Sequence, residues 1–209
     1  RLVEIGTISL GKIGFSYKDR FIQDKFTSPE RFDDVEFNRN YNSGSTLQQQ
    51  NQQLREFSLT FLPNDLLSIN SSLGLLRIGN DFASDRYNNT IRFSDRTNFN
   101  LDYNVDFVSS KNLVLQSKWL RQRGNAYYSV WKLKPGVEFL AEDRLDKRKN
   151  IDSLISGSLK FYEVNPYLEI IDIEGLKLTG KYSLRDDYLP VAGYLIRESY
   201  SRAQFYELN

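Results

Sequence analysis

The chain has 209 residues and a formal net charge of +1, from 28 basic and 27 acidic side chains, and it contains no Cys, His or Met. These numbers exclude disulfides, zinc sites built on Cys or His, and Ser-His-Asp or Cys-His nucleophiles within the chain. The balanced charge provides no general field that would attract nucleic acid, and we expect no cofactor and no metal. Because Met is absent, we also expect a processed form or an excised piece of a longer protein.

A nucleotide site is not expected either. The segment Gly6–Lys12 matches the spacing GxxxxGK of a phosphate-binding loop. The next residue is Ile13, where such a loop needs Ser or Thr for magnesium, and the segment alternates like a strand. We interpret the match as chance.

The clearest signal of secondary structure is the alternation in residues 98–108. Every even position from 98 to 106 is Asn or Asp, and the odd positions carry Phe99, Leu101, Tyr103, Val105 and Phe107. Successive side chains of a strand point to opposite faces, so this pattern predicts a half-buried β-strand.

Weaker alternation of the same kind runs through most of the chain. It predicts an all-β protein with an antiparallel meander of about 11–12 strands, closed into a barrel, which could span a membrane, or folded into a sandwich. We expect residues 1–209 to form a single β domain or a fragment of a larger β protein. The predicted strands cover residues 7–18, 56–61, 67–75, 86–94, 98–108, 112–121, 126–133, 137–141, 154–164, 167–173, 176–185 and 193–208.

Several stretches are predicted to lie outside strands. Residues 19–55 lose regular alternation and predict a long irregular loop or insertion, with a short helix over 46–55 as an alternative for its second part. Residues 142–152 are rich in charge and predict a solvated loop. Turns are predicted at Gly124-Asn125, at Lys134-Pro135-Gly136 and at Asn165-Pro166.

The most unusual local composition lies within the long loop, between residues 31 and 41. Its charged and aromatic side chains fit a docking arm, in which arginines pair with acids and aromatic rings serve as anchors. The competing interpretation is a surface loop held by its own ion pairs and rings. The candidate binding residues are Arg31, Phe32, Glu36, Phe37, Arg39 and Tyr41.

Acidic side chains provide the only candidates for catalysis or calcium binding. Glu142 with Asp143, and Asp186 with Asp187, are adjacent in sequence, but a glycosidase needs two carboxylates that face each other across about 5–10 Å. Asp143 and Asp146 could offer oxygens to calcium, which needs six to eight of them in a defined loop. Acidic residues at turns and loops are more simply solvated, so we expect no catalytic residue and no metal ligand.

A lipid-facing barrel and a soluble sandwich share the alternating pattern. Abundant Tyr and Phe, segments near ten residues, and rows of Asn, Asp, Ser and Lys favour the membrane. Outer-membrane barrels place their long loops at one end, after every second strand, and the long connections predicted here do not follow that rule unless one strand is miscounted.

A resemblance adds to this interpretation. The segment Phe26–Tyr41, with Ser28-Pro29-Glu30-Arg31-Phe32 and Val35-Glu36-Phe37-Asn38-Arg39-Asn40, resembles a stretch of large β-rich envelope proteins of the Bacteroidota and their relatives. The later strands, with aromatic alternation and Arg-Gly or Pro-Gly turns, resemble the same type. The resemblance implies a β architecture and an outer-membrane or cell-surface location, and it transfers no catalytic residues.

We therefore expect a non-enzymatic structural, pore-forming or assembly component of a bacterial outer membrane or cell surface. Its expected partners are outer-membrane lipid or other envelope proteins. One alternative is a soluble extracellular module that binds a glycan or protein ligand on a β-sandwich. A carboxylate-based glycoside hydrolase is the third hypothesis.

Overall fold

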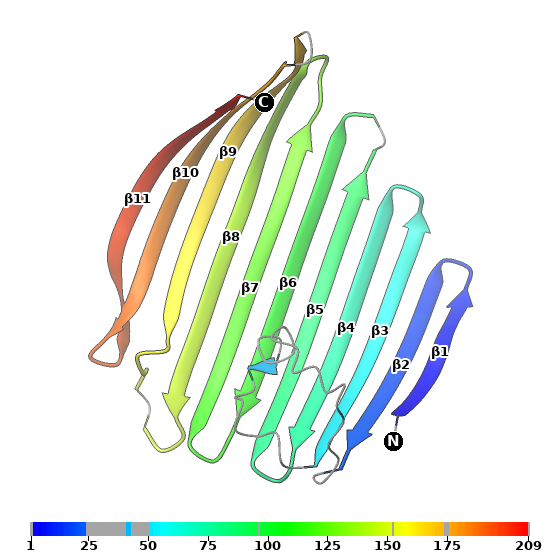
Figure 1. Cartoon of the computed structure of the whole chain (residues 1–209), viewed down its shortest axis with the longest axis vertical. Coiled ribbons are helices and arrows are strands. Elements are labelled where there is room, and N and C mark those ends of the chain that lie inside the picture. The colour runs from blue at the N-terminus through cyan, green and yellow to red at the C-terminus, as the bar shows by residue number, and fades with distance from the viewer. Residues whose placement is uncertain are drawn as a thin grey trace.

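The fold is one antiparallel sheet in which every strand pairs with the next strand along the chain (Figure 1). The computed structural model describes residues 2–23, 41–42, 51–95, 97–151, 153–173 and 176–208. Its strands are β1 (Leu2–Leu10), β2 (Ile13–Ile22), β3 (Gln52–Asn64), β4 (Leu67–Ile78), β5 (Phe82–Ser94), β6 (Phe99–Lys111), β7 (Leu115–Tyr128), β8 (Leu133–Arg148), β9 (Leu159–Ile173), β10 (Leu176–Val191) and β11 (Tyr194–Leu208). The predicted all-β meander is confirmed, and over these residues it is an open sheet in which β1 and β11 are the edges.

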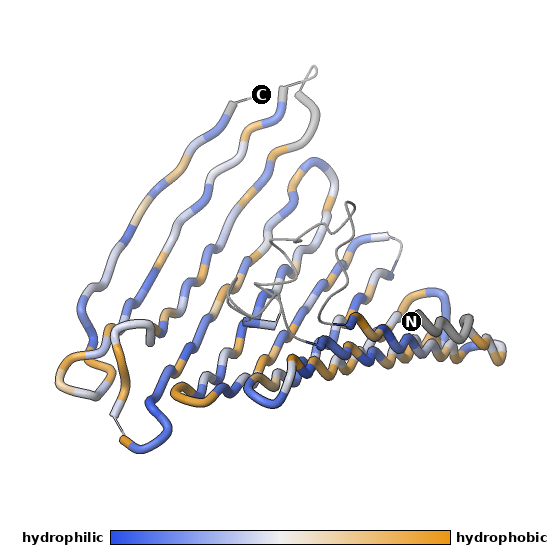
Figure 2. The backbone as a smooth tube through the Cα atoms, turned by 60° about the horizontal axis from the view of Figure 1, so that its bottom comes forward, coloured by the Kyte–Doolittle hydropathy of each residue, from blue (hydrophilic) through white to orange (hydrophobic). Residues whose placement is uncertain are grey.

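The connections differ sharply between the two ends of the sheet. The two longest, residues 23–51 and 149–158, both join strand ends that are lowest in Figure 1, and we call this edge of the sheet the loop end. Every connection at the opposite turn end has only two to four residues. The sheet is also curved across its width, so that β11 and β1 face different directions (Figure 2).

The structure has 11 strands, within the predicted number, but it corrects the predicted strand boundaries. Residues 7–18 are not one strand: Gly11 and Lys12 form a turn, and Gly11 has a φ of 60° that suits glycine. The extra hairpin moves the long connection to a position after the second strand. The rule that long loops share one end, which the predicted strands broke, is satisfied by the strands of the structure.

Other predicted breaks lie inside strands. Gly124-Asn125 is part of β7, Pro135-Gly136 is part of β8, and Asn165-Pro166 is part of β9. The predicted solvated loop over 142–152 begins too early, because β8 continues to Arg148. The proposed helix over 46–55 is wrong from residue 52 onward, where β3 begins, and its earlier part lies outside the described residues.

Strand register sorts the side chains into two faces. The odd positions of β6, from Phe99 to Phe107, share one face with the alternate residues opposite them on β5 and β7. We call this the apolar face. The even positions of β6, from Asn100 to Asp106, lie on the other side, which we call the polar face. The alternation in the sequence predicted this division correctly.

Burial is inverted relative to that polarity. On the polar face, Asp106 is only 5% exposed and Asn165 is fully buried, and serines on the same face are also buried. On the apolar face, Leu59 is 45% exposed and Tyr87 is 42% exposed. The small cluster of buried apolar residues also belongs to the polar face, at its loop end, and comprises Tyr41, Leu54, Leu76, Ile78 and Phe82.

Candidate functional site

The apolar face carries a band of hydrophobic side chains across the sheet, which Ser71, Asn89 and Gln122 interrupt one step toward the loop end from its central row. Its central row follows the register from β2 to β10, and neighbours in this row are directly opposite one another. The row contains Ile13, Phe61, Ile69, Ile91, Tyr103, Gly124, Phe139, Val164 and Leu184. A surface of this kind needs an apolar environment or a partner, because isolated soluble domains rarely expose apolar patches above a few hundred Å².

An aromatic row borders the band on its loop side. Tyr17, Phe57, Tyr87 and Phe107 occupy the same level on β2, β3, β5 and β6. The rings of Tyr17 and Phe57 touch, with centroids 4.8 Å apart. Aromatic girdles at this position are typical of β-sheets that cross a membrane, where they lie at the level of the lipid headgroups.

Charged residues also lie on the apolar face near this level. Asp19, Arg55 and Asp85 lie one step closer to the loop end than the aromatic row, and they form the ion pairs Asp19–Arg55 at 3.6 Å and Asp85–Arg77 at 2.7 Å. On the later strands the charges lie nearer the turn end, because Asp143 and Lys160 share the level of Phe107 and pair at 3.7 Å, and Asp186, which pairs with Arg197, is level with Val105. The polar boundary of the apolar band is therefore closer to the turn end on β8 to β10 than on β2 to β5.

The height of the band can be estimated on β6. Phe99 to Phe107 spans eight residue steps, or about 26 Å at roughly 3.3 Å per step. A strand tilt of about 40° would reduce this to roughly 20 Å along a membrane normal, close to the apolar band of about 25 Å in outer-membrane sheets.

The polar face is held by a network around Asp106, at the middle of the sheet. Arg86 on β5 donates to the carboxylate at 2.8 Å, and Arg121 on β7 donates to its other oxygen. The Arg121 guanidinium also lies over the Trp119 ring, 4.2 Å from its centroid. Trp119 in turn donates its indole N–H to Glu142 on β8 at 2.8 Å. This network links β5 to β8 through charged side chains and the ring of Trp119.

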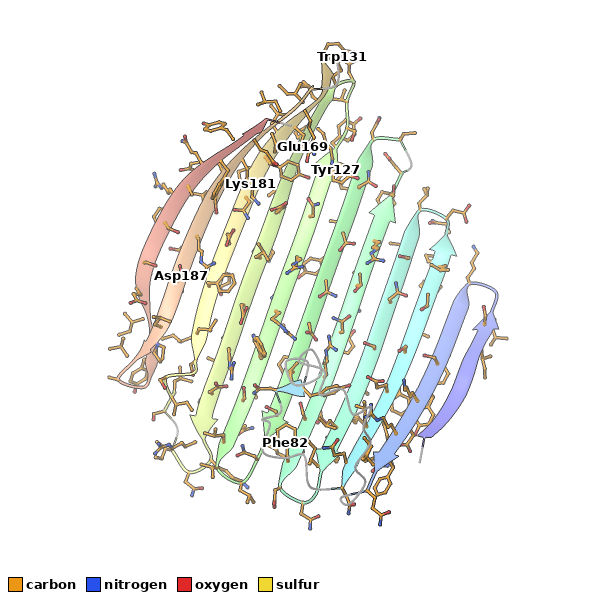
Figure 3. All side chains as sticks on the ribbon, in the orientation of Figure 1. Phe82, Tyr127, Trp131, Glu169, Lys181 and Asp187 are labelled. Atoms are coloured by element: carbon orange, nitrogen blue, oxygen red, sulfur yellow. The ribbon has the colours of Figure 1, made fainter. Side chains whose placement is uncertain are left out.

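Toward the turn end, the polar face carries further ion pairs, and Figure 3 labels Tyr127, Glu169 and Lys181 in this part of the sheet. Lys134 lies 3.2 Å from Glu169 and 4.1 Å from the centroid of the Tyr127 ring. Lys181 pairs with Glu138. An open hollow of about 1140 Å³ extends along this end and is lined in part by Arg92, Asn100, Asp102, Asn125 and Tyr127. These groups form a polar surface suited to contact with water.

Tyr41 packs against the loop end of the polar face. It is 3% exposed, and its hydroxyl donates to Glu56 on β3 at 3.1 Å. Gly74 on β4 leaves the room for the ring, because a Cβ at that position would collide with the Tyr41 hydroxyl. Burial, followed by the negative charge of Glu56, raises the pKa of the Tyr41 phenol well above its ordinary value.

Asn42 continues the same contact. Its side-chain amide donates to the Ser110 hydroxyl on β6 at 3.1 Å and accepts from Arg144 on β8 at 3.4 Å. The connection between β2 and β3 is thus attached to strands on both sides of the middle of the sheet, on the polar face.

The structure places only one of the candidate binding residues of the docking arm. That residue is Tyr41, and its observed partners belong to this chain. The other five, Arg31, Phe32, Glu36, Phe37 and Arg39, lie outside the described residues. Sequence reasoning missed the site formed by Asp106, Arg86 and Arg121. The alternation in residues 98–108 placed Asp106 on the polar side of its strand, but its two arginine partners follow only from the pairing of β5 and β7 with β6.

The acidic pairs considered for catalysis do not converge. In each of the pairs Glu142–Asp143 and Asp186–Asp187, the two neighbours point to opposite faces of a strand. The calcium candidates Asp143 and Asp146 are likewise separated by the sheet, with Asp146 on the polar face. No arrangement of carboxylates across a cleft arises from these residues.

No protein-family model matches the chain, and a comparison with curated proteins finds no significant match. Among the described residues, no helix is both long enough and apolar enough to cross a membrane.

Proposed function

We propose that the chain forms a wall of a bacterial outer-membrane protein, with a structural, pore-forming or assembly role. In this arrangement the apolar band contacts lipid acyl chains and the polar face lines a water-filled space. The observation that carries the proposal is the inversion of burial, in which hydrophobic side chains are exposed on one face while Asp106, Asn165 and Asp146 are buried on the other.

The energetics of the two faces support a lipid environment. Each large apolar side chain removed from water contributes about 1.5–3 kcal/mol, and the band repeats across nearly every strand. In a soluble sandwich the same rows would be covered by a second sheet. The described strands all belong to a single sheet, and Tyr41 and Asn42, which lie outside the strands, contact its polar face.

The order of elements at the border of the band supports the same environment. Over β2 to β5, an aromatic row and then the paired charges of Asp19, Arg55 and Asp85 follow the hydrophobic residues toward the loop end, as expected where acyl chains give way to headgroups and water. Both long connections join strands at the loop end, beyond that border. These features favour an orientation in which the loop end and the turn end lie on opposite sides of a membrane.

The proposal is tested by partition of the purified chain between aqueous buffer and mild detergent, with gel mobility before and after heating as a second readout. We expect the chain to require detergent and to migrate differently when unheated. Conductance across a planar bilayer would then separate a pore from a structural wall. A chain that stays soluble and monomeric without detergent would contradict the proposal and favour the soluble glycan- or protein-binding module.

A further inference from the structure

Strand β11 departs from the polarity of the strands beside it. Leu184 of β10 belongs to the central row of the apolar band, and the residue directly opposite it on β11 is Arg202. Gln204 follows on the same face. On the polar face, Phe205 lies opposite Lys181 and is 55% exposed. The apolar row therefore ends at β11 in a cation.

Arg202 contacts a tyrosine ring and has no acidic partner within the described part of the chain. Its Nε donates to the Tyr200 hydroxyl at 3.1 Å, and its guanidinium lies 4.9 Å from the centroid of the same ring. The other arginine of this strand, Arg197, pairs with Asp186 on β10. A charged group at the middle of an apolar band needs a counter-ion, because an unpaired charge that faces acyl chains is strongly unfavourable.

Elsewhere in the sheet, cations have carboxylates directly opposite them on a neighbouring strand. Such pairs are Arg92 with Asp102, Arg121 with Asp106, and Lys134 with Glu169. Arg202 has Leu184 in this position on its inner side. A carboxylate in the same relation to Arg202 would therefore lie on the outer side of β11.

The outer side of β11 is an open edge of the sheet. Among the described strands, β11 pairs only with β10, and it forms one side of the sheet in Figure 1. The outward backbone N–H and C=O groups of such an edge need partners, and water is absent from the hydrocarbon core. An added β-strand would satisfy these groups and place one side chain directly opposite Arg202.

The direction of the added strand follows from the sheet. Every strand is antiparallel to the next one, so β1 and β11 run in the same direction. The edge strand β1 could therefore pair with β11 only in parallel, unlike every pairing in this sheet. The same holds for β1 or β11 of a second copy in the same membrane orientation. The occupant that fits is a different strand, antiparallel to β11.

We propose that the outer edge of β11 binds an antiparallel β-strand of a protein partner, and that this strand carries a carboxylate directly opposite Arg202. The site rests on the proposed membrane function, because the lipid environment is what requires a partner for both the backbone edge and the guanidinium. It adds the edge through which the wall is extended and the chemistry that selects the neighbouring strand.

The test uses a synthetic peptide with the sequence of residues 98–108 as the strand probe, because its alternation suits a strand with one apolar side. Three versions carry Tyr103→Glu, Tyr103→Gln or Tyr103→Lys on that side. Fluorescence anisotropy of the dye-labelled peptides measures their affinity for the full chain in mild neutral detergent.

The chain variants are R202Q and R202E, with R123Q as the matched control. R123Q removes the same charge as R202Q from an exposed position on the polar face of β7, away from the edge. Far-UV circular dichroism and unheated gel mobility confirm that the three variants fold.

We expect the native chain and R123Q to bind the Glu peptide about tenfold more tightly than the Gln peptide. R202Q should lose this preference, and R202E should prefer the Lys peptide. A Glu peptide with N-methyl groups on its backbone nitrogens should lose binding, because it cannot donate to the edge of β11. A Glu preference that persists in R202Q would overturn the carboxylate partner, and undiminished binding of the N-methylated peptide would overturn the pairing with the edge.

Failure of the membrane function has a different signature. A chain that requires detergent, but binds the Glu and Gln peptides equally, would overturn the strand site alone. A chain that stays soluble and monomeric without detergent would overturn the proposed function, and with it the strand site, because Arg202 would then be solvated by water.

Discussion

Replacement of Ile69 by arginine tests the direction in which the apolar face points. Ile69 lies in the central row of the band, directly between Phe61 and Ile91. An arginine that faces lipid at the middle of a bilayer costs about 2–4 kcal/mol. We therefore expect Ile69→Arg to shift the folding equilibrium in vesicles by roughly 30- to 700-fold.

The same strand supplies the control and a depth series. Ser72 lies on the polar face between Ser58 and Asn88, so Ser72→Arg should change stability by less than about 1 kcal/mol. Leu75 lies nearer the loop end, close to the natural Arg77 on the same face. Leu75→Arg should therefore cost less than Ile69→Arg.

The assay is reversible guanidinium unfolding in lipid vesicles, followed by tryptophan fluorescence and by gel mobility. A cost that falls from Ile69 toward Leu75 is expected for a lipid-facing band, because the penalty for arginine depends on depth. Equal costs at Ile69 and Ser72, or a cost at Leu75 as large as that at Ile69, would refute the reasoning.

Three further predictions concern the polar face. Gly74→Ala should displace the Tyr41 ring and expose it to iodination or other tyrosine-specific labelling. In a chain that already carries Tyr41→Phe, Gly74→Ala should change the extent of labelling little. The phenol pKa of Tyr41 is raised, so the hydrogen bond from Tyr41 to Glu56 should be intact below about pH 10 and should be lost as the pH rises through the raised pKa. The titration of Tyr41 is measured as the difference in tyrosinate absorbance between the native chain and Tyr41→Phe. Asp106→Ala removes the carboxylate that Arg86 and Arg121 share, and it should lower the free energy of chemical unfolding by about 3 kcal/mol. Asp102→Ala breaks a largely exposed ion pair with Arg92 and should lower it by less than about 1 kcal/mol.

The alternation in residues 98–108 predicted β6 well because that strand crosses the whole apolar band. Alternation disappears where a strand leaves the band. On β8, Glu142 and Arg144 on the polar face alternate with Asp143 and Lys147 on the apolar face, so both faces carry charge and the segment looked like a loop. Hydrophobic periodicity reports the environment of a strand, and it fails where both faces of that strand are wet.

Turn signals failed inside strands for a different reason. Gly136 lies opposite Tyr167 on β9, and a Cβ on Gly136 would collide with the Tyr167 ring. Gly124 likewise has the Tyr103 ring close by, with a carbon of that ring 3.2 Å from where a Cβ would be. These glycines make space for aromatic rings from the neighbouring strand, and no local sequence pattern distinguishes that role from a turn.

The candidate site was only partly predictable. Tyr41 was selected for its composition, and its partners Glu56 and Gly74 required knowledge of the register of β3 and β4. The same holds for the network around Asp106, because Asp106 and Arg121 are 15 residues apart in sequence and become neighbours only through the pairing of β6 with β7.

The most direct test of the two faces uses single cysteines on β6, since the natural chain has none. Cysteines at Leu101, Tyr103 and Val105 would be compared in lipid vesicles with cysteines at Asn100 and Asn104. One readout is labelling by a membrane-impermeant maleimide, and the other is quenching, by lipid-borne quenchers, of a fluorophore attached to the cysteine. The account predicts quenching by lipid at the odd positions and labelling from water at the even ones. The account would be contradicted if the odd positions were protected from the maleimide in a lipid-free, monomeric chain. It would also be contradicted if labelling and quenching did not alternate between neighbouring positions of β6.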